Sequence, residues 1–101
     1  MADMKYSQIY ASAARLLRAV AHPVRLEILT CLIRKKRMSV GELQETLAIS
    51  QSMTSQHLAS LKNAGVVNCL KRGNVCHYHI QNPEALKLLE CIERCVKRGK
   101  T

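Results

Sequence analysis

The fold of this chain is decided by residues 39–65, which read SVGELQETLAISQSMTSQHLASLKNAG. The stretch begins with Ser39 and Glu42 at the spacing of a capping box, in which each side chain accepts a hydrogen bond from the other residue's amide. This spacing predicts a helix that starts at Ser39. The apolar residues that share one face of this helix, and must be buried, are Val40, Leu43 and Leu47.

A second helix is predicted after the connection Leu47-Ala48-Ile49-Ser50. Ser50 is a favourable N-cap, because its hydroxyl can accept a hydrogen bond from an amide of the first helical turn. Gly65 is expected to end the helix in a left-handed conformation. Residues 39–64 are therefore predicted to form a helix-turn-helix. The residues of the second helix that should face inward are Met53, His57, Leu58, Leu61 and Ala64.

The outward face of the second helix indicates what the chain binds. Uncharged hydrogen-bonding side chains crowd its first turns, and such groups contact base edges and phosphates when a helix N-terminus enters the major groove of DNA. The positive end of the helix macrodipole favours the same contacts. On an isolated helix these side chains would simply be solvated. The candidate DNA contacts here are Gln51, Ser52, Thr54, Ser55, Gln56 and Lys62.

Two segments of the chain resemble a known family. Residues 51–61, QSMTSQHLASL, resemble the recognition-helix signature of the ArsR/SmtB family of winged-helix repressors, Gln-Ser-x-(Val/Thr)-Ser-x-His-Leu-x-x-Leu. Residues 22–29, HPVRLEIL, are similar to that family's second-helix segment, and the resemblance extends over roughly residues 8–98. It implies an α+β, mainly α fold, a winged helix-turn-helix with five helices and one β-hairpin wing.

The wing is predicted over residues 66–80. Two runs rich in β-branched residues, 66–71 and 75–80, flank the turn residues Arg72-Gly73-Asn74. Side chains at the tip of such a wing can contact the DNA backbone or the minor groove, which adds affinity rather than sequence information. These candidates are Lys71, Arg72 and Asn74.

A disulfide across the wing is conceivable, since Cys69 and Cys76 lie on its two predicted strands. A four-residue loop from Lys71 to Asn74 would place the two cysteines opposite each other, whereas a two-residue turn would not. The sequence leaves both registers open.

The chain of 101 residues is long enough for a single domain, and it is strongly basic. Sixteen Lys and Arg against seven Asp and Glu give a net charge of +9, which indicates a polyanionic partner such as nucleic acid. An anionic membrane surface is the weaker interpretation. No apolar run approaches the roughly 18 residues that span a bilayer, and the N-terminus lacks the features of a signal peptide. We therefore expect a cytoplasmic protein.

A homodimer is expected, because a small core without Phe or Trp gains stability by burying a further apolar face. Residues 7–20 and 83–98 carry apolar helical stripes and are predicted to be the dimerisation helices, while residues 1–6 form a flexible arm. Such a dimer would bind an inverted-repeat operator. The candidate interface residues are Leu16, Leu88, Leu89, Ile92 and Val96.

Catalysis is not expected, because the chain has no Gly-rich phosphate loop, paired carboxylates or nucleophile motif. No cofactor is expected either. Many members of the resembled family sense metals, through a Cys-x-Cys pair on the third helix or through Asp, His and Glu on the last. This chain has residues 42–45, ELQE, at the first place and Arg98, which cannot ligate a cation, at the second. Cys91 and Cys95 remain weak candidates for a thiophilic metal or arsenite that acts as inducer.

Three cysteines outside the wing are candidate sensing residues, namely Cys31, Cys91 and Cys95. Some members of the resembled family that lack metal ligands sense oxidants or persulfides by pairing a cysteine of the second helix with one of the last helix. The resemblance implies Cys31 with Cys91 or Cys95. A direct Cys91–Cys95 bond is disfavoured, because Cβ atoms at i and i+4 lie about 5 to 6 Å apart while a disulfide needs about 3.8 Å. Alternatively, all three are small hydrophobic residues that only pack.

The main hypothesis is thus a dimeric, sequence-specific transcriptional repressor that a thiol-directed signal releases from its operator, the signal being an oxidant, a persulfide or a thiophilic metal. The alternative is a basic interaction module that binds RNA or protein without sequence-specific DNA readout. RNA modules stack bases on exposed aromatic side chains, and this chain has three tyrosines as its entire aromatic content. This deficit favours the DNA-binding hypothesis.

Overall fold

A computed structural model describes residues 5–99 of the chain. This part forms a winged helix-turn-helix with five helices and a three-stranded antiparallel sheet of order β1-β3-β2, which confirms the predicted fold and hairpin. The helices are α1 (Tyr6–Val20), α2 (Pro23–Lys35), α3 (Val40–Leu47), α4 (Gln51–Asn63) and α5 (Pro83–Gly99). The strands are β1 (Met38–Ser39), β2 (Val67–Arg72) and β3 (Val75–Ile80).

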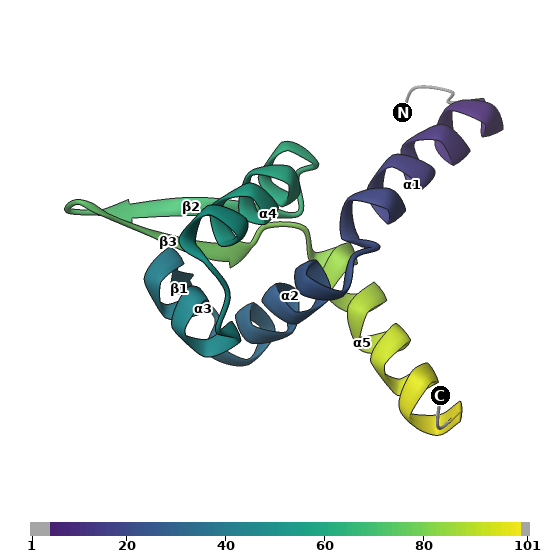
Figure 1. Ribbon diagram of the computed structural model, residues 1–101. Helices are drawn as coiled ribbons and strands as arrows, with labels where there is room; N and C mark the ends of the chain where they lie inside the picture. The colour runs from purple at the N-terminus through teal and green to yellow at the C-terminus, as the bar shows by residue number, and fades with distance from the viewer. Residues whose placement is uncertain (1–4, 100–101) are drawn as a thin grey trace.

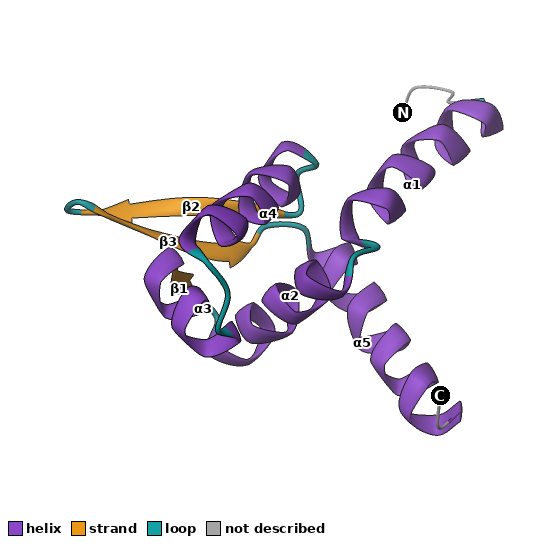
Figure 2. Cartoon of the chain, in the orientation of Figure 1, coloured by secondary structure: helices purple, strands orange, loops and turns teal. Residues whose placement is uncertain are grey.

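The elements divide the molecule into a body and two projecting ends (Figure 1). Helices α2, α3 and α4 form the body, and the β2–β3 hairpin extends from it on one side. Helices α1 and α5 extend away from each other at the opposite end, as the secondary-structure colouring in Figure 2 shows. Within residues 5–99, no helix is both long and apolar enough to cross a membrane. Of the arm predicted for residues 1–6, residues 1–4 lie outside the described part, and α1 already begins at Tyr6.

The core is aliphatic and centres on α2, as its nearly all-round apolar sequence predicts. Ile28, Leu29 and Leu32 of this helix are at most 2% exposed. Strand β2 closes the core from the hairpin side through Val67, which follows the buried Val66. The other fully buried leucines come from the helix-turn-helix and are Leu43, Leu58 and Leu61.

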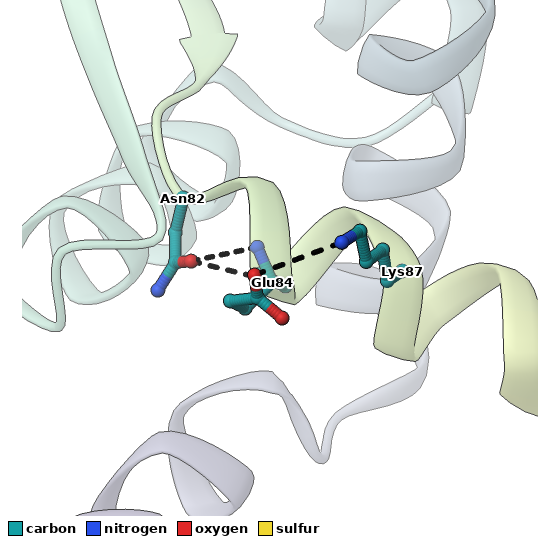
Figure 3. Close-up of polar contacts among 4 residues, drawn as sticks. Asn82, Glu84 and Lys87 are labelled. Atoms are coloured by element: carbon teal, nitrogen blue, oxygen red, sulfur yellow. Dashed lines mark hydrogen bonds and ion pairs between the residues drawn. The ribbon is translucent and has the colours of Figure 1, made fainter.

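The helix ends follow local sequence signals. The Ser39 hydroxyl accepts from the Glu42 amide (3.1 Å) while the Glu42 carboxylate accepts from the Ser39 amide (2.9 Å), which confirms the capping box. The hydrogen bond that the Glu42 carboxylate accepts from the Ser39 amide is the main cause that lowers the pKa of this carboxyl, and the Ser39 side chain lowers it further. At the start of α5, the Asn82 side-chain oxygen accepts from the Glu84 amide (2.9 Å), and Lys87 lies within ion-pair distance of Glu84 (3.8 Å; Figure 3).

Gly65 ends α4 in the left-handed region, as predicted, with φ +77°. The Gly65 amide donates to the Lys62 carbonyl (3.0 Å) and the Val66 amide donates to the Leu61 carbonyl (3.0 Å), the pair of bonds that defines a Schellman motif. Val66 and Leu61 are both fully buried. The motif therefore turns the chain directly from the recognition helix into the wing.

The structure adds one element to the predicted fold and corrects one residue. The added element is strand β1, whose two residues are too few for any sequence periodicity and which exists only through the pairing of Met38 with Tyr78 and Ser39 with His77. Leu89 was expected in the dimer interface, but it is only 7% exposed and belongs to the core of its own chain. The apolar stripe of α5 is thus divided between an inner part around Leu89 and an outer part around Ile92.

Candidate nucleic-acid interface

The N-terminal end of α4 presents a polar surface. Ser50 caps the helix, since its hydroxyl accepts from the Met53 amide (3.1 Å), as predicted. Free helical amides and the positive end of the macrodipole face outward at this end. The exposed side chains around it are Gln51, Ser52, Ser55 and Gln56, all predicted as DNA contacts.

Thr54 is corrected from a DNA contact to a core residue. Its exposed fraction is 0%, and its hydroxyl donates to the Ser50 carbonyl (2.8 Å). That internal hydrogen bond allows a threonine to be buried with its methyl group against the core. Met53, which was expected to face inward, is instead 42% exposed. The buried face of α4 therefore runs through Thr54, Leu58 and Leu61, one residue out of phase with the prediction at its start.

A hydrogen-bonded arginine, Arg25, connects the recognition helix to the rest of the chain. Its Nε donates to Nδ1 of His57 (3.1 Å), and its Nη1 donates to the Ala19 carbonyl at the end of α1 (2.9 Å). The ring of His57 also lies against that of His22, with 4.5 Å between their centres. Arg25 thus joins α1, α2 and α4, and His57 is a packing and hydrogen-bonding residue, as predicted.

The environment of His57 favours its neutral form. Burial lowers its pKa first, and the positive charges that His22 and Arg25 can carry lower it further. A neutral Nδ1 is what the Arg25 donor requires. No sequence pattern predicts this pairing, because 32 residues separate the two side chains.

The wing presents cations at its tip. Arg72 pairs with Val75, so a two-residue turn of Gly73 and Asn74 closes the hairpin. Lys71, Arg72 and Asn74 are exposed, as expected for DNA contacts. Within residues 5–99, neither these two cations nor Lys62 of α4 takes part in an ion pair. Their charges therefore remain available to an anionic partner.

A disulfide joins Cys69 and Cys76 across the wing. The two residues are not directly opposite, because Cys69 pairs with Tyr78 and Lys71 pairs with Cys76. They are diagonal neighbours on one face of the hairpin, with 5.6 Å between their Cα atoms, a separation that suits a disulfide. As expected, the two-residue turn does not place the two cysteines opposite each other, but strand twist brings this diagonal pair close enough to bond.

The other three cysteines are free thiols. Cys31 is half-buried against the core, and burial raises its pKa, an effect that nearby Arg34 partly offsets. Cys91 and Cys95 are exposed and line a shallow groove with Arg94 and Arg98 near the end of α5. The structure brings neither of them into a bond with Cys31.

The residues present do not fit a metal site within one chain. Among residues 5–99, no group of three or more His, Cys, Asp or Glu is arranged to hold a metal ion. Cys91 and Cys95 alone supply two ligands, and the neighbouring Arg94 and Arg98 are cations. A thiophilic ligand would need a further donor from another chain.

Comparisons with known proteins agree with this architecture. Residues 22–68 match the family model described as bacterial regulatory protein, arsR family. The transcriptional activator HlyU of Vibrio cholerae is 40% identical over 84 residues, which cover 83% of this chain and 77% of HlyU. Its solved structure superposes with a TM-score of 0.78 over 85% of this chain and 92% of that chain.

Two further relatives cover similar lengths. The transcriptional repressor PagR of Bacillus anthracis is 35% identical over 79% of this chain and 83% of PagR, and its structure gives a TM-score of 0.79. Rv0081 of Mycobacterium tuberculosis is 34% identical over 94% of this chain and 83% of that protein, with a TM-score of 0.79. The chain therefore belongs to the ArsR family of bacterial regulatory proteins, which are DNA-binding transcriptional regulators and not enzymes.

Proposed function

We propose that this regulator is a homodimeric repressor that binds an inverted-repeat operator with one recognition helix in each half-site. The observation that carries the proposal is the surface of α4, where a capped helix end exposes uncharged donors and acceptors beside an unpaired basic wing. A helix end of this kind is suited to the major groove, and the wing cations are suited to the adjacent backbone.

The proposed partner for dimerisation is a second copy of this chain. At the end away from the wing, α1 exposes Tyr6 (76%), Ile9 (41%), Tyr10 (66%) and Leu17 (48%). On α5, Ile92 is 36% and Val96 is 45% exposed. Two projecting helices with such side chains would leave a large apolar surface in water, and a two-fold dimer would cover both copies at once. Leu16 and Leu88 are half-buried beside these residues.

Repression and a thiol-directed release are further parts of the proposal. Relatives at this level of similarity include the repressor PagR and a biofilm growth-associated repressor of Agrobacterium fabrum. HlyU is named as an activator, and one solved form of it is described as reduced. With five cysteines in 101 residues, this chain offers targets for an oxidant, a persulfide or a thiophilic metal.

Operator binding tests the proposal. A footprint of the purified protein on its own upstream DNA should protect two half-sites about one helical turn apart. Ser52→Ala and Gln56→Ala should relax sequence preference. Lys71→Ala should instead weaken binding to all duplexes and reduce the salt dependence by about two units of slope, one for each subunit of the dimer. Matched controls at the other end of the chain are Ser7→Ala and Lys87→Ala, which should leave both properties unchanged.

The result that would contradict the proposal is equal affinity for operator and random duplex at moderate salt. Preference for single-stranded RNA over the operator would instead support the alternative of an RNA-binding module.

A further inference from the structure

The wing disulfide lies where the hairpin loses its support. Strand β1 pairs with β3 at Tyr78 and His77 and ends there. Cys76 precedes His77 in β3, on the side of the turn, and from Cys76 to the turn the hairpin consists of two strands only. Leu70 and Val75 in this projection are 46% and 47% exposed, which shows that little packs against it. A two-stranded hairpin without further support is only marginally stable in water.

The disulfide also lies next to the proposed DNA contacts. Lys71 follows Cys69 by two residues and is the ladder partner of Cys76. Arg72 is the last residue of β2 before the turn. The orientation of both cations therefore depends on how rigidly the strands are joined at the Cys69–Cys76 pair.

We propose that Cys69 and Cys76 form a thiol–disulfide exchange site that sets operator affinity through the stiffness of the wing. The bonded state holds the basic tip in position and binds DNA more tightly, and the dithiol state binds less tightly. This inference rests on the proposed DNA binding and places a thiol-directed signal in the wing, where a reducing thiol, rather than an oxidant, is the reagent that releases the operator.

The proposed reactants are a small disulfide, which oxidises the two wing thiols, and a small thiol, which reduces the wing disulfide. One wing thiolate attacks a sulfur of the small disulfide, which forms a mixed disulfide and releases one small thiol. The second wing thiolate then attacks the wing sulfur of that mixed disulfide, forms the Cys69–Cys76 bond and releases the second small thiol. The wing loses two protons and two electrons in total, and reduction reverses both steps. Both cysteines are half-buried rather than enclosed, so the reactant can reach them.

The other cysteines are less suited to act on the wing. Cys31 lies against the core, where burial keeps its thiol protonated and less reactive. Cys91 and Cys95 lie on α5, at the opposite end from the hairpin (Figure 1).

The test compares operator affinity after treatment with oxidised glutathione or dithiothreitol, in three proteins. In the parent protein, reduction should weaken operator binding about threefold to tenfold, the size expected for the cost of ordering one or two flexible groups. The triple variant Cys31→Ser, Cys91→Ser, Cys95→Ser keeps the wing pair and should respond like the parent. The double variant Cys69→Ser, Cys76→Ser should bind like the reduced parent under both treatments. Amide hydrogen exchange at residues 70–76, measured without DNA, should be faster in the reduced parent.

A double variant that still responds like the parent, or a parent that does not respond, would overturn the inference. A response that disappears only in the triple variant would overturn it too, and would move the signal to α2 and α5 while the proposed function stands. Loss of sequence-specific binding in both redox states would contradict the proposed function instead. In that case amide hydrogen exchange still tests the stiffening of the wing, because equal exchange rates in the oxidised and reduced protein would overturn it.

Discussion

The helix-turn-helix and the α1–α5 end of this regulator use the same aliphatic residue types but place them in different environments. Leu43, Leu58 and Leu61 are fully buried within one chain. Leu17, Ile92 and Val96 are between 36% and 48% exposed. The DNA-facing unit thus completes its packing inside one chain, whereas the other end leaves apolar side chains exposed, which the proposed second copy would cover. Four changes test this difference, from the largest expected effect to the smallest.

The buried unit should be the more sensitive to truncation. Leu58→Ala removes a fully buried side chain and is expected to lower the free energy of unfolding by about 2 to 5 kcal/mol, because the cavity cannot collapse completely. Leu70→Ala, at an exposed leucine of the wing, is the control and should cost about 0.5 kcal/mol or less. Urea denaturation at one fixed protein concentration measures both. Equal losses would show that the two environments do not differ in packing.

The exposed end should respond in assembly rather than in folding. Ile92→Glu with Val96→Glu places two charges on the proposed interface, so sedimentation should show monomer where the parent is a dimer. Operator affinity should fall about a hundredfold, since the two half-sites are no longer linked. Gln81→Glu adds a negative charge just before α5 and should leave the dimer intact. A dimer that survives the double substitution would place the interface elsewhere.

The caps make the helix-turn-helix self-contained, and their loss should have a smaller effect. Ser50→Ala removes the acceptor for the Met53 amide and is expected to cost about 1 kcal/mol of stability. Ser55→Ala, at an exposed serine inside α4, is the matched control and should be neutral, because alanine favours a helix interior. Thermal unfolding without DNA separates the two. A neutral Ser50→Ala would mean that packing alone positions this helix.

The smallest effect is expected at the connection between the two regions. The pKa of His57 is lowered by burial and by His22 and Arg25, so the unfolded chain takes up the proton first as the pH falls below about 6.5. The His57 contribution to stability is therefore present above that pH and is lost as the pH falls toward the folded pKa. His57→Gln should flatten this part of the stability profile between pH 7.5 and pH 5.5, roughly the range in which a histidine titrates. An unchanged profile would show that His57 does not contribute to the pH dependence of stability in this range.

Much of this architecture could be predicted because its signals are local. Ser39 with Glu42 and Ser50 form hydrogen bonds with amides within a few residues, and Gly65 adopts the positive φ that ends α4, so these signals depend little on the rest of the chain. Apolar residues on almost every side of residues 26–33 likewise indicate a central helix, which is α2. The polar residues at the start of α4 were found because they cluster at a helix end.

The errors and omissions share a different physical origin. Thr54 is buried because its hydroxyl bonds to the Ser50 carbonyl, while Met53 beside it is exposed, and the residue types alone favour the opposite assignment. Leu89 is buried by its own chain because α5 packs against α2 and the sheet there, which an apolar stripe alone does not reveal.

By itself, the sequence determined the helices, their caps, the hairpin and the family resemblance, since these depend on contacts three or four residues apart and on the pleat of single strands. Only the tertiary structure decided the added strand β1, the diagonal Cys69–Cys76 bond and the Arg25–His57 hydrogen bond. Each of these depends on strand twist, register or the approach of distant elements. Such geometry is set by how the packed body forms as a whole, and no short stretch of residues encodes it.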